Sequence, residues 1–320
     1  MSALTWEPAS IITGFRLETP LGSGGFGSVW RAVPEGGGDP VALKLLNGRF
    51  SDEDTARMRG DVELLAASAS SSSPHIVKVL GGGTDPVPYV VMELIDGTDL
   101  GRELDRRARV APPGRFSQGE TIGIARSVAS ALGVLRATGI IHRDVKPANV
   151  MIDKAGVVKL ADFGIAKIVG FDSVTATSQL PMSMAYAAPE VWEGHATHQS
   201  DLYALGCMLY QCLAGRPPFT GSYAEVFRKH LSAAPDLGAL PADIAPSLLE
   251  LLRLCLMKQG ADRPANSDAV LALLECAERE VAARPTSETT VAVVAVPAHE
   301  PQGAARRSGD TATSPPNSTS

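Results

Sequence analysis

Two short stretches near the middle of the chain carry residues that could together move a phosphoryl group. Residues 142–149 read HRDVKPAN and combine a carboxylate, a lysine and an amide, and residues 162–164 read DFG. A carboxylate can accept the proton of a hydroxyl group, and carboxylate and amide oxygens are ligands that Mg²⁺ prefers. The combination predicts transfer of a phosphoryl group from a magnesium nucleotide to a hydroxyl.

A glycine-rich stretch earlier in the chain supplies an element that could bind phosphate. Residues 21–29 read LGSGGFGSV and contain the spacing G-x-G-x-x-G, whose glycines let the backbone approach phosphate oxygens. In a dinucleotide-binding protein this spacing leads from a strand into a helix, whereas here a second strand-like segment follows. We therefore expect a β-hairpin that covers phosphates, and a plain turn is the alternative.

Lys44 ends the next apolar segment, VALK, at residues 41–44. A lysine in such a strand is usually a surface residue. At this distance behind a glycine loop, it is expected to face the α and β phosphates of a nucleotide.

The elements that must position these residues change character along the chain. Apolar stretches separated by glycine and proline predict strands at residues 15–21, 28–33, 41–46, 76–80 and 89–94. Apolar residues at helical spacing predict helices at residues 58–69, 117–139, 200–215, 246–258 and 267–282. Ser117 and Glu120 have the spacing of a capping box, and Ser200 is expected to cap the helix that it begins.

The composition indicates a globular protein with mixed charges. The chain has 320 residues, 44% of them hydrophobic, and a formal net charge of −6, which argues against a general nucleic-acid binder. No apolar run approaches the roughly 18 residues of a membrane helix, and the N-terminus shows no secretory signal. The four cysteines form no CxxC pair and are expected to be reduced, which predicts a cytoplasmic location.

In their order along the chain, the motifs resemble those of the eukaryotic-type (Hanks-type) serine/threonine protein kinases, particularly the bacterial subgroup. The resemblance covers residues 15–276 and rests on GSGGFGSV, VALK, HRDVKPAN, DFG, AAPE and DLYALG. It implies an α+β, bilobal protein-kinase fold. A small N-terminal lobe would hold an antiparallel β-sheet and one main helix, and a larger C-terminal lobe would be mainly α-helical.

The resemblance also implies domain boundaries. An N-terminal extension would occupy residues 1–14 and the kinase domain 15–280. Residues 281–320 are predicted from their composition to be a disordered tail, because they are rich in Pro, Ser, Thr and Ala and poor in large apolar groups. Within the kinase domain, the N-lobe would span about 15–94, the hinge 93–97 and the C-lobe 98–280.

Catalytic roles follow from the resemblance. Asp144 would accept or orient the proton of the substrate hydroxyl, and Lys146 would neutralise charge on the transferred group. Asn149 and Asp162 would bind the magnesium ions, and Lys44 would complete the catalytic set. The spacing Asp-x-Lys-Pro-x-Asn looks like serine/threonine rather than tyrosine kinases.

An adenine site can be assigned in the same way. Met92 would be the gatekeeper, and the hinge backbone from Glu93 to Ile95 would pair with the adenine edge. Asp96 or Asp99 could reach the ribose, and the sequence does not choose between them. The implied nucleotide-binding residues are Leu21, Gly22, Ser23, Gly24, Gly25, Phe26, Gly27, Ser28, Val29, Ala42, Lys44, Met92, Glu93, Ile95, Met151 and Asp162.

The segment from 162 to 190 resembles the activation segment of these kinases. Arg143 would receive a phosphate added to this segment, and the resemblance predicts autophosphorylation at Thr175 or Thr177, with serines nearby. Ser183 matches the family's threonine that contacts both the catalytic aspartate and the catalytic lysine.

Two supporting roles are implied outside the motifs that touch substrate. Glu190 would form an ion pair with Arg263, and Asp201 would accept backbone hydrogen bonds from the catalytic loop. The histidines of His195-Ala-Thr-His198 are expected to be solvated, because no further metal ligands accompany them.

One position departs from the family pattern. Where relatives carry a glutamate that pairs with the strand lysine, this sequence aligns Asp61, which is one methylene shorter, with Lys44. The pairing of Lys44 is therefore open. Activity could require that phosphorylation or a partner moves the helix.

The activity that the resemblance implies is transfer of the γ-phosphoryl group of ATP, with Mg²⁺, to serine or threonine hydroxyls of proteins in signal transduction. A homodimer would serve trans-autophosphorylation, and neither nucleic acid nor a membrane segment is implied. One alternative is a nucleotide-binding pseudokinase or regulatory scaffold with weak activity, which only Asp61 favours. A second is a kinase-like enzyme for a small molecule, against which the complete segment 164–190 argues.

Overall fold

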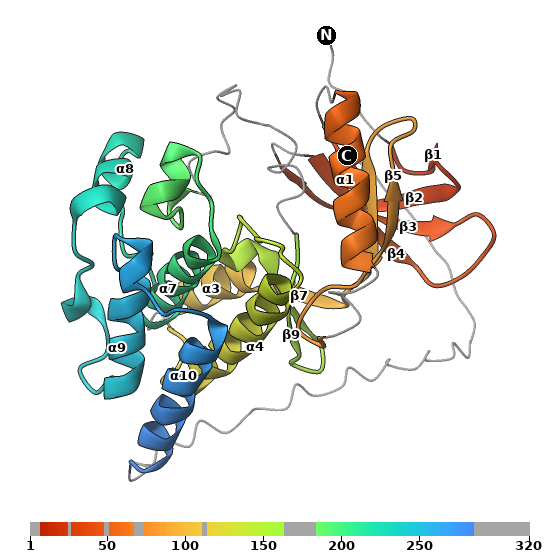
Figure 1. Ribbon diagram of the computed structural model, residues 1–320. Coiled ribbons are helices and arrows are strands. Elements are labelled where there is room, and N and C mark those ends of the chain that lie inside the picture. The colour runs from red at the N-terminus through yellow and green to blue at the C-terminus, as the bar shows by residue number, and fades with distance from the viewer. Residues whose placement is uncertain are drawn as a thin grey trace, which may run out of the picture. The chain divides into compact units, whose positions relative to one another are not determined.

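The computed structural model describes residues 7–24, 27–47, 51–66, 73–110, 114–162 and 184–284, apart from the side chains of Asp54 and Asp61. The chain divides into two compact units, Met1–Arg284 and Pro285–Ser320. Every helix and strand named below belongs to the first unit (Figure 1). The tail expected from residue 281 begins inside the last helix, which continues through Ala282, and its residues from 285 lie outside the described ones.

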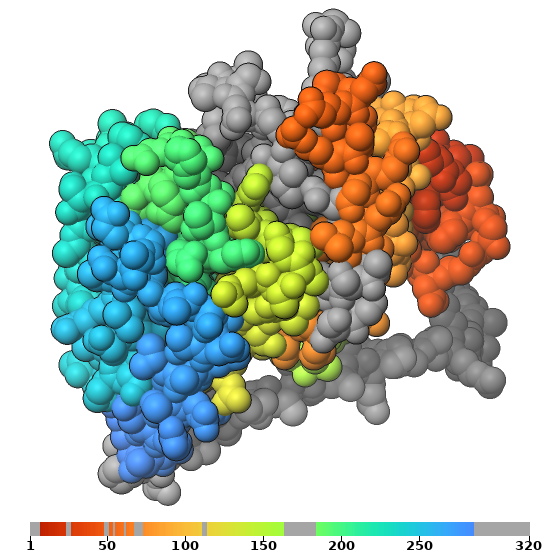
Figure 2. Space-filling view, viewed as in Figure 1, coloured from red at the N-terminus to blue at the C-terminus, as the bar shows by residue number. Residues whose placement is uncertain are grey.

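In the described part of the chain, six antiparallel strands and one helix form the first lobe. α1 (Asp52–Leu64) packs beside the last strand in space, β5, against the sheet (Figures 1 and 2). This arrangement confirms the predicted sheet lobe with one main helix. In spatial order the strands are β1 (Ile11–Ile12), β2 (Phe15–Gly24), β3 (Gly27–Pro34), β4 (Val41–Leu46), β6 (Tyr89–Glu93) and β5 (Val79–Gly83).

The alternation of β4 assigns its lysine to one face of the sheet. Leu43 and Leu45 belong to a small apolar cluster, whereas Ala42 and Leu46 belong to the main hydrophobic core. Alternate residues of a strand point to opposite faces. Lys44 therefore shares the face of Ala42 and Leu46, on the main-core side.

The glycine-rich stretch is the predicted β-hairpin. β2 and β3 pair up to the point where Gly24 lies opposite Gly27. At Gly27 φ is +151°, and a Cβ atom there would lie 2.0 Å from the carbonyl oxygen of Leu45. Only glycine fits so close to the neighbouring strand. Gly25 and Phe26 lie outside the described residues.

The second lobe is built around α7 (His198–Ala214). Nearly every residue of this helix is buried, as expected for a helix that is apolar on every side. Gly206 permits close packing with α9, because a Cβ atom there would lie 2.6 Å from the Cβ of Cys255. The other long helices are α3 (Leu100–Ala108), α4 (Gln118–Ala137), α8 (Tyr223–Ser232), α9 (Pro246–Cys255) and α10 (Ser267–Ala282).

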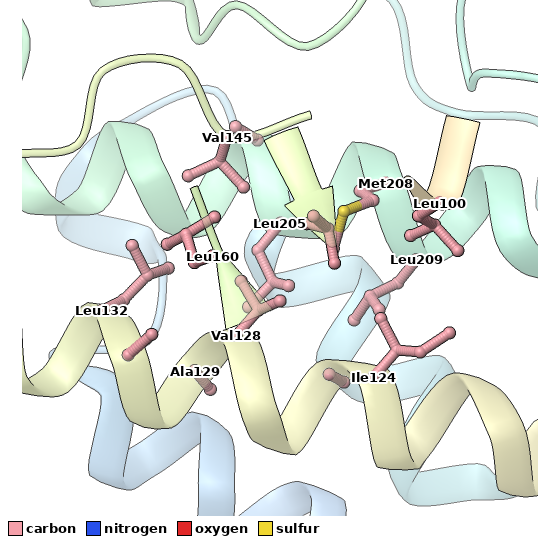
Figure 3. Close-up of a cluster of buried hydrophobic side chains, with 14 of the residues drawn as sticks. Leu100, Ile124, Val128, Ala129, Leu132, Val145, Leu160, Leu205, Met208 and Leu209 are labelled. Atoms are coloured by element: carbon pink, nitrogen blue, oxygen red, sulfur yellow. The ribbon is translucent and has the colours of Figure 1, made fainter. Parts of the chain in front are cut away.

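The core of this lobe reaches the strand that precedes Asp162. Val128 of α4 and Leu205 of α7 pack in one cluster with Leu160, the last residue of β9 (Val158–Leu160) (Figure 3). Leu160 and Leu205 are fully buried. The approach to Asp162 is therefore anchored in the helical core.

A small second sheet connects the hinge with the catalytic loop. Its antiparallel strands are β7 (Gly97–Asp99), β8 (Val150–Asp153) and β9. Ile76 adds a single parallel bridge to Leu160. The hinge, the exit of the catalytic loop and the approach to Asp162 thus belong to one hydrogen-bonded unit.

The helix caps confirm one prediction and correct another. Ser117 and Glu120 form the predicted capping box of α4. Ser200, however, is not the N-cap of α7: the N-cap is Thr197, and the Ser200 hydroxyl, in the first turn, accepts a 3.0 Å bond from the Thr197 amide. The prediction was wrong because a serine three residues after a threonine can take the place of the usual glutamate in a capping box.

Two boundaries in the first lobe also differ from prediction. β5 spans Val79–Gly83 rather than residues 76–80, and α1 begins at Asp52 rather than at residue 58. Three glycines carry no side-chain signal for a strand, so pairing with β6 decides the position of β5. The first turn of α1 is polar and therefore lacks the apolar spacing on which the prediction depended.

The cysteines are free, as predicted, and burial raises the pKa of the Cys207, Cys212 and Cys255 thiols. Within the part of the chain that the structure describes, no helix combines the length and the apolar character needed to cross a membrane.

Candidate active site

The catalytic loop is anchored to α7, the central helix of the second lobe. Asp201, near the start of α7, accepts a 2.8 Å hydrogen bond from the backbone N–H of His142 and another of 2.8 Å from that of Arg143. Arg143 has a φ of +64°, a conformation that L-residues adopt only when the surroundings enforce it. The predicted role of Asp201 is confirmed, and its carboxylate holds the loop in this unusual turn.

His142 links the catalytic loop to the residue before Asp162. Its side chain is fully buried. The Nδ1 atom accepts a bond of 3.3 Å from the Asp144 N–H, so the proton lies on Nε2, which donates to the Ala161 carbonyl at 3.0 Å. The two motifs that carry the acidic residues are therefore joined through one imidazole ring.

Asp144, Lys146 and Asn149 meet in one cluster. The Lys146 Nζ lies 2.7 Å from Oδ2 of Asp144. The Asn149 side-chain amide nitrogen donates to the Asp144 carbonyl at 2.8 Å and to its Oδ2 at 2.9 Å. Because the amide nitrogen is used in this way, the amide oxygen of Asn149 is the atom that can serve as a metal ligand.

Lys44 forms an ion pair with Asp162. The Nζ of Lys44, from β4, lies 2.5 Å from Oδ1 of Asp162, and the two side chains are 14% and 31% exposed. Asp162 has a φ of +61°. The alternative partner from α1, Asp61, has its side chain outside the described residues, so the expected departure at that position remains a prediction.

The five apolar residues expected around adenine differ in their burial. Ala42 pairs with Met92 across β4 and β6, and both are buried in the main core. Val29 and Met151 are partly buried and pack against this core. Leu21, on β2, is 38% exposed. Ala42 and Met92 are thus neighbours inside the core, whereas Val29 and Met151 lie at its border and Leu21 is exposed.

The hinge carboxylates are engaged with other parts of the chain. Asp99 caps α3 by accepting a 2.9 Å bond from the Arg102 N–H. Asp96 pairs with Lys154 at 2.7 Å on the surface. Neither contact decides which of the two aspartates would reach a ribose.

Glu93 makes a set of contacts that sequence reasoning missed. Its backbone N–H donates to the Lys78 carbonyl at 2.9 Å. Its carboxylate accepts from the Lys78 N–H and from Lys159, at 2.8 Å in each case. The only signal in the sequence is Lys159 itself. It lies in β9, whose three residues are too few to show alternation of apolar and polar side chains.

The predicted ion pair at the end of the activation segment is confirmed. Arg263, whose side chain is fully buried, donates to the two oxygens of Glu190 at 2.6 and 2.8 Å. Burial alone would raise the pKa of Glu190, but hydrogen bonds from Arg263 and Ser200 outweigh it and lower that pKa. This pair ties the segment to the helical lobe.

Several predicted residues lie outside the described part of the chain. They are Gly25, Phe26, Phe163, Gly164, Ser173, Thr175, Thr177, Ser178 and Ser183. The two histidines of 195–198 are described, and no group of three or more metal-ligating side chains occurs among the described residues.

Comparison with known proteins identifies the class of this fold and site. Residues 15–273 match the family described as "Protein kinase domain". The chain therefore belongs to the protein kinase domain family.

Two of the similar named proteins come from Mycobacterium tuberculosis. The chain is 36% identical over 259 residues to serine/threonine-protein kinase PknA of Mycobacterium tuberculosis, covering 78% of this chain and 58% of PknA. It is 36% identical over 222 residues to serine/threonine-protein kinase PknE of the same organism, covering 69% of this chain and 38% of PknE. The chain thus spans less than two thirds of the length of either relative.

A solved structure shares the fold. The kinase domain of Mycobacterium tuberculosis PknI superposes with a TM-score of 0.67 at 27% sequence identity, covering 87% of this chain and 100% of that domain. The bilobal kinase fold predicted from the sequence is confirmed.

Proposed function

We propose that this chain is a serine/threonine protein kinase, which transfers the γ-phosphoryl group of ATP to serine or threonine hydroxyls of proteins. The observation that carries the proposal is the cluster in which Lys146 and Asn149 both bind the carboxylate of Asp144. A carboxylate oriented by two donors is suited to hold an incoming hydroxyl group, because its lone-pair directions are fixed. The names of the mycobacterial relatives support the same reaction class.

The donor atoms near this cluster suit a magnesium nucleotide. Mg²⁺ prefers oxygen ligands, and Asp162 offers a carboxylate while Asn149 offers an amide oxygen. Bound there with ATP, the metal would supply charge neutralisation for the phosphates. Lys44 lies 2.5 Å from Asp162, and this contact supports a role for its ammonium group beside the phosphates.

Lys146 is proposed to act on the same reaction as Asp144. Its ammonium group pairs with Oδ2 of Asp144, so it can stay beside the acceptor while charge builds on the transferred group. The resemblance of the surrounding spacing to serine/threonine kinases supports these two hydroxyl acceptors over tyrosine.

Control by phosphorylation is part of the proposal. Thr175 or Thr177 would be modified by the enzyme itself, with a homodimer serving the reaction in trans, and Arg143 would receive the added phosphate. The kinase domain is proposed to span residues 15–280.

Transfer of radiolabel from γ-labelled ATP to a generic basic protein tests the proposal. The Asp144→Asn variant is expected to lose about 10³-fold in rate, within the range for removing a catalytic base. Asp243→Asn, which alters an exposed carboxylate in a surface pair with Arg284, is the matched control and should retain wild-type rates.

The outcomes separate the candidate functions. Equal labelling by wild type and Asp144→Asn would overturn the proposed role of Asp144. Magnesium-dependent nucleotide binding without any transfer would favour the pseudokinase alternative. Transfer of phosphate to a small molecule but to no protein would favour a kinase-like enzyme that acts on a small molecule.

A further inference from the structure

We propose that Lys159 and Glu93 are positioning residues, whose ion pair fixes the hinge to the strand that leads to Asp162. The inference rests on the proposed function, because it assigns the hinge to adenine and Asp162 to the metal. Neither Lys159 nor the Glu93 carboxylate has a role in the chemistry described above.

The pair is well formed and shielded from solvent. The Nζ of Lys159 lies 2.8 Å from each carboxylate oxygen of Glu93. The two side chains are 16% and 23% exposed. Glu93 Oε1 also accepts a 2.8 Å bond from the Lys78 N–H, and the Glu93 N–H donates to the Lys78 carbonyl at 2.9 Å. A carboxylate with this many donors has one orientation.

The segment that contains Lys78 is also hydrogen-bonded to β9. The Val77 N–H donates to the Leu160 carbonyl at 2.9 Å, and the Leu160 N–H donates to the His75 carbonyl at 2.8 Å. The His75 ring bonds the Val158 carbonyl at 2.9 Å. Hydrogen bonds therefore join residues 75–78 both to β9 and to Glu93 at the start of the hinge. The ion pair of Lys159 with Glu93 joins β9 directly to the hinge.

Movement of β9 would be passed on to the two proposed ligand contacts. Lys159 lies opposite Met151 in the β8–β9 ladder, and Met151 is the residue proposed to lie against adenine. Toward the other end, Ala161 donates to the Asn149 carbonyl at 2.8 Å, and Asp162 follows directly. The Glu93–Lys159 pair thus sets the distance from the hinge to Met151 and to Asp162.

The same hinge offers a natural comparison. Asp96 and Lys154 pair at 2.7 Å between the hinge and the turn after β8, with 75% and 77% of their side chains exposed. Exposed ion pairs contribute little because water competes for both charges. The inner pair should therefore matter for nucleotide binding, and the outer pair should not.

The test compares Lys159→Met, Lys159→Arg and Lys154→Met. Initial rates of labelling are measured over a range of MgATP concentrations, and binding of a non-hydrolysable MgATP analogue is measured by calorimetry. We expect Lys159→Met to raise KM for MgATP and the Kd of the analogue about tenfold while kcat stays within about threefold, the signature of lost binding rather than lost chemistry. Lys159→Arg should restore most of the affinity, and Lys154→Met should match wild type.

Each result bears on the inference. An unchanged KM and Kd in a folded Lys159→Met variant would overturn it, and so would an equal effect of Lys154→Met. A fall in kcat alone would assign Lys159 to the chemical step instead. If the wild type neither binds the analogue nor transfers phosphate, the proposed function fails and the inference fails with it. A wild type that does both, with unaltered variants, rejects the inference alone.

Discussion

The two halves of the candidate site are held in different ways. The catalytic loop is fixed by the core of the helical lobe, because Asp201 binds two backbone N–H groups and His142 is buried beneath the loop. Lys44 and Asp162 come from separate lobes and meet in one partly exposed ion pair. The half proposed to act on the acceptor hydroxyl is therefore part of the folded core, whereas the half proposed to hold phosphate depends on a contact between lobes.

Backbone strain follows the same division. Arg143 and Asp162 both have positive φ angles, of +64° and +61°. Asp201 stabilises the turn at Arg143 through main-chain hydrogen bonds. The side chain of Asp162 is bonded to Lys44. A loss of stability and a loss of activity should therefore coincide in the first half and separate in the second.

The largest effect on the free energy of unfolding is expected for Asp201→Ala. The substitution removes the acceptor of two N–H groups in a buried place, and each such donor costs about 1–3 kcal/mol when it is left unsatisfied. We expect a loss of about 3 kcal/mol or more in urea unfolding, together with a loss of phosphoryl transfer of at least about 10²-fold. Asp201→Asn keeps one acceptor oxygen, so its free energy of unfolding should lie between those of Asp201→Ala and wild type. Wild-type stability of Asp201→Ala would contradict the anchoring of the loop.

A smaller loss is expected for Glu190→Gln. The fully buried side chain of Arg263 would lose its bidentate carboxylate partner, and breaking such a pair costs up to about 3–5 kcal/mol. Because Glu190 is itself partly exposed, we expect about 2 kcal/mol. The matched control is Glu53→Gln in the surface pair with Arg57, which should change stability by less than about 0.5 kcal/mol. Equal effects of the two variants would remove the distinction between core and surface pairs.

Glu103 should also make the free energy of unfolding of the helical lobe depend on pH. Hydrogen bonding from Arg106 lowers the pKa of Glu103 to about 2, although burial raises it. The folded pKa lies below the unfolded value of 4.5, so this contribution is complete above pH 4.5 and is lost as pH falls toward 2. Glu103→Gln should therefore be less stable than wild type by about 1 kcal/mol at pH 7, and the two urea curves should converge near pH 2. A difference that persists at pH 2 would assign the effect to packing.

The sequence predicted best where a residue type and its partner both lie in a strong motif. Asp201 and the Glu190–Arg263 pair were assigned correctly through the family resemblance, and the capping box at Ser117 through its spacing alone. The partner of Lys44 could not be predicted, because it depends on how β4, α1 and the chain after β9 approach one another in space. The role of Lys159 was missed for the same reason, since its partner Glu93 lies on another strand.

The smallest effect on stability is expected for Lys44→Met. The substitution leaves Asp162 without its cation, but the Asp162 side chain is 31% exposed and can be hydrated. We therefore expect the free energy of unfolding to change by less than about 1 kcal/mol, while labelling falls by about 10²-fold or more because a cation beside the phosphates is lost. Lys44→Arg keeps the charge and controls for it. A destabilisation above about 2 kcal/mol would show that the Lys44–Asp162 pair supports the fold as Asp201 does, and the two halves of the site would then be held alike. Retained stability with lost transfer would establish that this contact serves the phosphate side of the reaction and not the integrity of the core.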